Sequence, residues 1–179
     1  MSDDNFLLRL QKALNSILPS QPTEIDYTPV IEKSQVLKSI NVEEQKAIEV
    51  VYKPDCKDAH EEWMSASTIG KGEASFRNNE VSSNLFHLVE TDRFSITKSW
   101  LLEEDTDFQV DTVTKTLAKG TWLAEVHYSD NALWELKKSN ELGGLSLGGY
   151  GDVNKETGEI TNLCFSEDEY LAIHNEESK

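Results

Sequence analysis

The chain has 179 residues, enough for one domain with a hydrophobic core and short appendages. Its 17 lysines and arginines stand against 33 aspartates and glutamates. The resulting formal charge of -16 argues against binding to nucleic acid or an anionic membrane, because both attract clustered positive charge. There is no apolar run like a signal peptide or membrane span, and the two cysteines are predicted to be reduced thiols of a cytosolic protein.

The N-terminal segment, residues 1–45, is predicted to lie outside the folded domain. Apolar residues recur at helical spacing over residues 5–18, which predicts a short amphipathic helix. Three of the four prolines follow it in a polar stretch without a regular period, which is typical of an extended linker arm. We therefore place the start of the folded domain near Lys46 and its end at residue 173, before a short acidic tail, 174–179.

From Lys46 onward, short β-rich runs predominate, and each is bounded by turn-forming residues. The predicted strands cover residues 46–52, 84–90, 93–100, 121–128 and 159–165. The strand over 84–90 is expected to pair with 93–100 across a turn at Thr91 and Asp92, and residues 103–119 are expected to form a loop or an irregular hairpin.

Two helices are predicted among these strands. The first covers about 66–77 and is weakened by Gly70 and Gly72. The second covers 132–138 and is capped by Ser129 or Asp130, whose side-chain oxygen can accept a hydrogen bond from a free amide of the first turn. The chain therefore reads as an α+β domain, with a mostly antiparallel sheet or small barrel and a few flanking helices. The four tryptophans are predicted to pack in its core.

Residues 143–151 hold five of the chain's nine glycines around a single serine, Ser146. Glycine allows close approach of a ligand to the backbone and leaves amide groups free to stabilise a developing negative charge. Ser146 is therefore a candidate nucleophile. The alternative is a glycine-rich turn between two strands, in which the serine hydroxyl only satisfies a local hydrogen bond.

Residues 144–148 also match G-x-S-x-G, the nucleophile motif of α/β-hydrolases. That fold needs a long parallel α/β framework before the serine, with an acid and then a histidine well after it. Too few residues follow Ser146, and the strands before it do not alternate with long helices. The α/β-hydrolase interpretation is therefore excluded.

A nucleophilic serine needs a base within hydrogen-bond reach. The histidines are His60, His87, His127 and His174. His87 and His127 lie in predicted strands and the other two in charged segments, but the residues alone do not choose among them, and each is also compatible with simple packing. No spacing of cysteine and histidine suggests zinc, so we predict no metal site.

Several separate segments, in a fixed order, resemble the prohead (capsid-maturation) serine proteases of tailed bacteriophages, in the XkdF-like branch. They lie within about residues 46–151. The matching segments are Val50–Asp55 with Asp58, Met64–Ala66, a strand with histidine leading into Ile96–Trp100, Glu103–Asp105, Lys119–Leu123, Leu133–Lys138 and Gly144–Gly151. The resemblance implies the fold of the herpesvirus assemblin protease.

Carried onto this sequence, the resemblance implies that Ser146 is the nucleophile and His87 the general base. An acidic residue after the serine usually completes the site in this family, and Glu169 in Glu169–Ile173 is the nearest match. Glu167 is the second choice, and His174 the third, because herpesvirus enzymes use a second histidine. The Pro-Ala-Asn turn of the family is absent here.

The implied function is that of a serine endopeptidase that cleaves scaffold and major capsid protein during head maturation, inside the assembling procapsid in the host cytoplasm. It needs no cofactor, is expected to form a homodimer or larger assembly, and binds neither nucleic acid nor membrane. Residues 1–45 would dock the enzyme to its partners and be removed by self-cleavage. The alternatives are an inactive scaffold or capsid-assembly protein that keeps the fold, and a small acidic binding domain unrelated to phage.

Overall fold

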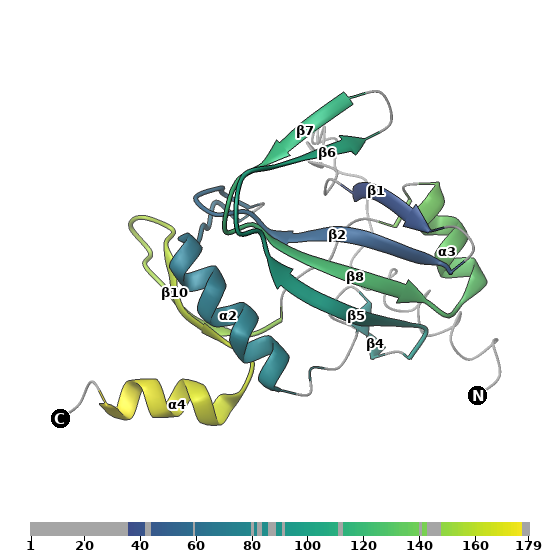
Figure 1. Cartoon of the computed structure of the whole chain (residues 1–179). Helices are drawn as coiled ribbons and strands as arrows, with labels where there is room; N and C mark the ends of the chain where they lie inside the picture. Colours follow the sequence, from purple (N-terminus) through teal and green to yellow (C-terminus); the bar gives the residue numbers. More distant parts are fainter. Residues whose placement is uncertain are drawn as a thin grey trace, which may run out of the picture.

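The computed structural model describes residues 36–41, 44–58, 60–79, 81, 84–85, 89–90, 92–110, 113–139, 141–142 and 148–176. An open antiparallel sheet of four strands, in the order β1-β2-β8-β5, lies at its centre (Figure 1). These strands are β1 Val36–Asn41, β2 Lys46–Tyr52, β5 Phe94–Leu101 and β8 Trp122–Tyr128. The alternative of a small barrel is wrong for the described residues, because β1 and β5 form separate edges and do not pair with each other.

Strand β8 confirms the strand predicted over 121–128 and is the centre of the core. Its buried residues Trp122, Leu123 and Val126 enter three different hydrophobic clusters. Trp122 packs with Ile69 of α2 (Ala66–Asn78), and Val126 packs with Trp134 of α3 (Asn131–Lys138). Because strand side chains alternate between faces, Trp122 and Val126 lie on one face of the sheet and Leu123, which packs with Leu117, lies on the other. Strand β8 therefore holds together elements from both sides of the sheet.

Helix α2 confirms the prediction for residues 66–77 and begins at a serine cap, where the Thr68 amide donates to the Ser65 hydroxyl at 3.2 Å. Gly72 also has a packing role that composition alone did not suggest. A Cβ at this position would lie 2.3 Å from the Leu163 Cδ2 atom of β10 (Ile160–Cys164). Glycine at position 72 therefore lets β10 pack directly against the helix.

Helix α3 confirms the second predicted helix and its cap. The amides of Ala132 and Leu133 donate to the Asp130 carboxylate at 2.8 and 3.0 Å, and Arg93 forms an ion pair with the same group. Burial alone would raise the pKa of Asp130, but the hydrogen bonds from the Leu133 amide and from Arg93 outweigh it and hold that pKa below its usual value. The cap is therefore charged at neutral pH.

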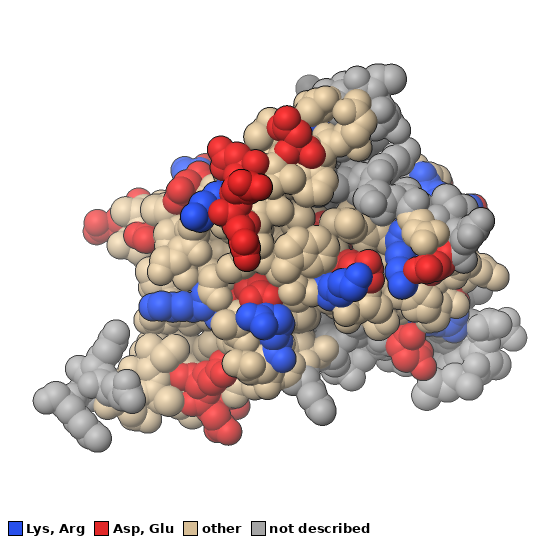
Figure 2. Space-filling view, in the orientation of Figure 1, with Lys and Arg blue, Asp and Glu red and all other residues tan. Residues whose placement is uncertain are grey.

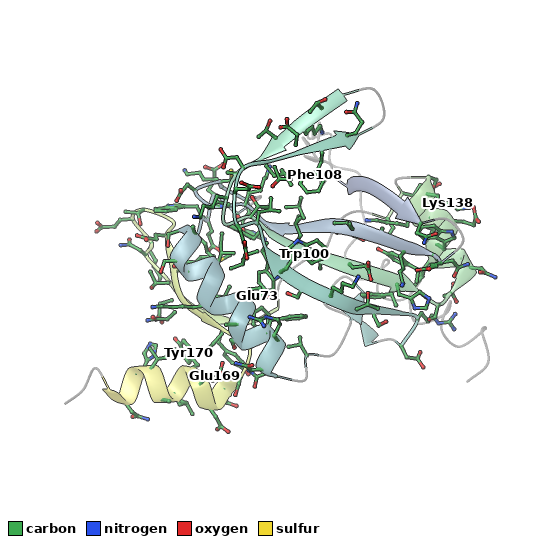
Figure 3. The ribbon with its side chains drawn as sticks, viewed as in Figure 1. Glu73, Trp100, Phe108, Lys138, Glu169 and Tyr170 are labelled. Atoms are coloured by element: carbon green, nitrogen blue, oxygen red, sulfur yellow. The ribbon has the colours of Figure 1, made fainter. Side chains whose placement is uncertain are left out.

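Residues 103–119 contain a regular hairpin, β6 (Thr106–Val110) with β7 (Val113–Leu117), which confirms the predicted hairpin but not its irregularity. Leu117 and Phe108 pack in one cluster with Leu123, next to Trp100 of β5. Figure 3 shows Phe108 and Trp100 between the hairpin and the sheet. The hairpin therefore covers part of the sheet with apolar side chains.

The prediction of a single strand over 84–90 is wrong. The structure has two short strands, β3 (Asn84–Leu85) and β4 (Val89–Glu90), which pair with each other in antiparallel fashion. The expected partner, β5, instead pairs with β8. Two segments that pair with each other cannot extend as one strand, and alternation in the sequence does not reveal this reversal.

The sheet begins at Val36, earlier than the boundary expected near Lys46. Strand β1 pairs with β2 from Val36–Glu49 to Asn41–Lys46, with an irregularity between Leu37 and Ile40. A polar stretch without a clear period can still be an edge strand, because only one of its sides must pair. The predicted helix at 5–18 lies outside the described residues.

A second, smaller layer follows the glycine-rich segment. Strand β9 (Tyr150–Val153) forms a hairpin with β10, and helix α4 (Glu167–Glu176) packs beside it (Figure 1). The turn predicted at 155–158 is present, with Gly158 at a φ of +73° that favours glycine. Helix α4 was not predicted, since residues 166–173 had no assigned element and 174–179 was expected to be a tail.

Three features complete the fold. Trp122 and Trp134 are buried as predicted, whereas Trp63 and Trp100 are only partly buried. Cys56 and Cys164 are both free thiols. Within the described residues, no helix is both long and apolar enough to cross a membrane.

Candidate active site

Ser146 and His87, the predicted nucleophile and base, both lie outside the described residues, so their position relative to each other stays a prediction. The structure does describe what holds the glycine-rich segment at each end. We call α3 together with Glu141 and Leu142 the α3 flank. We call Gly148 and Gly149 together with β9 the β9 flank.

The α3 flank leads the chain out of the hydrophobic core. The amides of Glu141 and Leu142 both donate to the Leu136 carbonyl, at 2.9 and 3.0 Å, which closes the C-terminal end of the helix. The Leu142 side chain then packs against the cluster that contains Trp134 and Tyr128. The residue just before the glycine-rich segment is therefore fixed by both hydrogen bonds and apolar contacts.

A buried ion pair ties the α3 flank to the sheet. The Lys137 Nζ atom lies 2.9 Å from Glu49 Oε2, and these side chains are 0% and 2% exposed. The Tyr128 hydroxyl donates a hydrogen bond to the other Glu49 oxygen. Burial, and then the negative charge of Glu49, raise the pKa of Tyr128 well above its ordinary value, so this hydroxyl remains a neutral donor.

The β9 flank depends on glycine for its close packing on β10. A Cβ at Gly149 would lie 2.8 Å from the Cys164 carbonyl oxygen and 3.3 Å from the Phe165 ring. A Cβ at Gly151 would lie 3.2 Å from both Ile160 and the Thr161 carbonyl oxygen. Two of the five glycines in the segment thus serve packing against the neighbouring strand.

Asp152 of the β9 flank is the centre of a polar cluster that sequence reasoning missed. Its carboxylate accepts hydrogen bonds from Asn162 Nδ2 and the Tyr170 hydroxyl, both at 2.8 Å, and lies 3.1 Å from His174 Nε2. The Asn162 hydrogen bond is the largest cause that holds the pKa of Asp152 below its usual value, with Tyr170 and His174 adding to it against the effect of burial. The carboxylate is therefore charged at neutral pH.

His174, the third choice for the last catalytic member, lies in this cluster. Its Nε2 faces the Asp152 carboxylate, and its Nδ1 lies 3.1 Å from the Tyr170 carbonyl oxygen. Both partners are acceptors, so only the doubly protonated imidazolium satisfies both contacts. The ring also lies against Tyr170, with 4.4 Å between ring centroids. A histidine held this way by a carboxylate has a fixed orientation.

Glu169, the first choice for that member, anchors α4 to α2. Its carboxylate accepts hydrogen bonds from the Ser75 hydroxyl and from Asn79 Nδ2, the latter at 3.2 Å. The Phe165 amide in turn donates to the Ser75 hydroxyl at 2.8 Å. Figure 3 shows Glu169 at the end of α4 nearest α2. Its carboxylate therefore has structural partners, and its catalytic role stays a prediction.

The remaining candidates lie elsewhere. Glu167 is exposed in the first turn of α4, where a negative charge stabilises a helix N-terminus. His60 is exposed, and its amide donates to Asp58. His127 is partly buried in β8 opposite Ser95. Among the described residues, no group of histidine, cysteine and acidic side chains is arranged to hold a metal ion.

Comparison with known proteins assigns the chain to a family. The family model described as "Putative phage serine protease XkdF" matches residues 33–155, which include Ser146 and His87. The phage-like element PBSX protein XkdF of Bacillus subtilis (strain 168) is 28% identical over 159 residues, covering 85% of this chain and 54% of that protein. The uncharacterized protein YqbD of the same organism is 26% identical over 126 residues, covering 70% and 38%.

The chain thus spans about half the length, or less, of these curated relatives. No solved structure matches the chain significantly, so the likeness to the herpesvirus protease fold stays a prediction. The family match covers the sheet, α2, α3 and the glycine-rich segment with both its flanks. On this evidence the chain belongs to the XkdF family of phage serine proteases.

Proposed function

We propose that this protein is a phage serine endopeptidase that cleaves scaffold and major capsid protein during head maturation. The observation that carries the proposal is the family match across residues 33–155, which spans both the glycine-rich segment and His87. In this mechanism Ser146 attacks a peptide carbonyl while His87 takes its proton and later delivers it to the leaving amine. Backbone amides of the glycine-rich segment would stabilise the oxyanion.

The two flanks support this proposal physically. An oxyanion site works when its donors are already in place before the reaction, because no energy is then spent on reorganising them. The α3 flank is fixed by the buried Glu49–Lys137 pair and the β9 flank by close packing on β10. Flanks that are fixed in this way support the proposal of a preorganised oxyanion site between them.

The third catalytic member is proposed to be Glu169 or His174. Glu169 would need to orient His87 while bound to Ser75 and Asn79, whereas His174 is already oriented by Asp152. Glu169→Gln and His174→Gln separate the two residues. Substitution of the catalytic residue should remove most of the enzyme's kcat with little change in KM. Substitution of the other residue should at most lower the Tm.

The proposed setting is the assembling procapsid in the host cell, where the protein works as a homodimer or a larger assembly. The decisive experiment co-expresses the chain with the scaffold and major capsid proteins of its own phage and measures their intact masses. Wild type should produce fragments, Ser146→Ala should not, and the matched control Ser139→Ala, an exposed serine after α3, should cleave normally.

The second candidate function is an inactive scaffold or capsid-assembly protein. The observation in its favour is that Gly149, Gly151 and Glu169 all have structural partners that explain them without catalysis. Uncut proteins in both wild type and Ser146→Ala, together with normal shells, would establish this alternative.

A further inference from the structure

Strand β9 has one edge without a partner strand among the described residues. It pairs only with β10, in the register Val153–Ile160 and Asp152–Thr161. The hairpin's hydrogen bonds show which groups point outward. The Asn154 amide donates to Glu159 on the β10 side, while the Ile160 amide points away from β9 and donates to Trp63, both at 2.8 Å.

In an antiparallel pair, successive residues direct their N–H and C=O groups alternately toward and away from the partner. Since Asn154 faces β10 and the Val153–Ile160 pair does not exchange hydrogen bonds, the backbone groups of Val153 point outward. The same alternation turns those of Gly151 outward, opposite the irregularity in β10 between Thr161 and Cys164. The outer edge of β9 therefore offers two donors and two acceptors at the spacing of a β-ladder.

Exposed apolar side chains lie beside this edge, on β9 and on α4. The large hydrophobic side chains that are exposed among the described residues are Val81, Tyr150, Val153 and Leu171, and three of these four lie on β9 or α4. Tyr150 is 43% exposed and lies 5.8 Å from Tyr170, which is itself held by its hydrogen bond to Asp152. Val153 lies three residues from Tyr150 along β9 and therefore on the opposite face of the hairpin, so exposed apolar side chains border the open edge on both faces. Such an edge is typical of a protein-binding site.

The charge of the same region indicates the kind of partner. Between residues 148 and 176 the charged side chains, apart from His174, are Asp152, Lys155, Glu156, Glu159, Glu167, Asp168, Glu169 and Glu176. A single lysine thus stands among seven acids, and Figure 2 shows acidic side chains over the start of α4. A positively charged segment is electrostatically complementary to this surface.

We propose that the outer edge of β9 binds an extended, basic segment of the protein to be cleaved, as an added antiparallel or parallel strand. The inference rests on the proposed function, since β9 begins at Tyr150, four residues after Ser146 in the sequence. Hydrogen bonds from the Gly151 and Val153 backbone hold the segment, and the Tyr150–Tyr170 pair contacts one of its apolar side chains. Four residues of chain span at most about 14 Å, so a substrate segment bound at Tyr150 would be within reach of Ser146.

Binding is tested without cleavage in full-length Ser146→Ala. The probe is a short end-blocked peptide of alternating valine and lysine, and its control alternates valine and glutamate. The basic peptide should slow amide hydrogen exchange at Gly151 and Val153, and added salt should weaken it. Exchange that slows at other amides but not at these two, or equal binding of the acidic peptide, would overturn the proposal.

A matched pair of variants isolates the backbone donor. Val153→Pro removes the outward N–H while Asp152 and Asn154 keep their contacts with β10, and Val153→Ala keeps the donor. Affinity for the basic peptide should fall about tenfold in Val153→Pro and little in Val153→Ala. If wild type and Val153→Pro cut capsid protein equally fast, the proposal that β9 binds the substrate is wrong, while the proposed protease activity is confirmed. If the basic peptide binds as described but capsid protein is not cut by wild type, β9 is confirmed as a binding edge and the proposed protease activity is wrong.

Discussion

The two flanks of the glycine-rich segment are held by different kinds of interaction. At the α3 flank, Lys137 and Glu49 form an ion pair that is excluded from water inside an apolar cluster. At the β9 flank, Asp152 and His174 form a pair whose side chains are 34% and 39% exposed. Breaking the first pair from one side should therefore be costly, whereas the second pair should be weak and screened by salt.

This difference fits a division of labour around Ser146. In the proposed mechanism, a rigid support on one side would hold the backbone donors that oxyanion stabilisation requires. In the proposed docking, an exposed support on the other side would let the edge of β9 receive a peptide. The comparison depends on the relative strength of the two supports, which substitution can measure.

The largest expected effect is at Lys137. Lys137→Met leaves the Glu49 carboxylate buried without this counter-ion, and breaking a buried pair from one side costs about 3–5 kcal/mol of the free energy of unfolding. Urea unfolding measures this change. Lys138→Met is the matched control, because Lys138 is partly exposed and pairs with the exposed Glu135, so it should cost under about 1 kcal/mol.

A second substitution separates the role of burial from that of charge. Glu49→Leu combined with Lys137→Met removes both charges and should recover much of the lost stability, since well-packed apolar residues often replace a buried pair at little cost. If Lys137→Met were as stable as Lys138→Met, the α3 flank would not be the stronger support and the comparison would fail.

The next effect concerns how β10 is held against α2. In Gly72→Ala the new Cβ would lie 2.3 Å from Leu163, so the side chain must move, and such overpacking typically costs about 1–3 kcal/mol. Gly70→Ala is a matched control on the same helix, where the nearest atom is 3.6 Å away, in ordinary contact. Since alanine favours helix more than glycine, Gly70→Ala should be neutral or stabilising.

Thermal unfolding of the two variants gives the comparison directly. If the Tm of Gly72→Ala were equal to or above that of Gly70→Ala, the close packing of Leu163 on Gly72 would not hold β10 against α2. The β9 flank would then be supported mainly by its polar cluster, and its expected sensitivity to pH would be larger.

The elements that could be predicted are those in which the apolar positions and capping residues of the sequence match the burial and caps seen in the structure. Strand β8 has apolar residues at its buried positions and places Glu125 and His127 at partly buried ones, and Asp130 carries the N-cap signal of α3. The reversal within 84–90 was missed because each half is too short to show a period. Helix α4 was missed because its acidic first turn resembles a solvated tail.

The candidate site was only partly predictable for the same reason. The glycine-rich segment stands out by composition, but Lys137 does not, because lysine is normally read as a surface residue. Its position three and four residues after Trp134 and Leu133, on the buried face of α3, was the available signal. Asp152 and Glu169 gain their partners from segments distant in the sequence, and no local pattern reports such contacts.

The smallest expected effect is the pH dependence of the β9 flank. The pKa of Asp152 is lowered in the folded protein, chiefly by Asn162, so its contribution to stability is present above the unfolded-state pKa and is lost as the pH falls through the folded value. That window lies below about pH 4, and for a group this exposed the contribution should stay within about 1 kcal/mol.

Asp152→Asn keeps the shape of the side chain but removes its charge, so it should flatten this part of the stability–pH curve. The difference in unfolding free energy between wild type and Asp152→Asn should be greatest near neutral pH and should shrink as the pH falls below about 4. Urea unfolding at a series of pH values measures it, with 1 M salt as a control that should reduce the difference. A difference that is constant with pH would mean that Asp152 acts through packing and not through its charge, and that pH does not adjust the β9 flank.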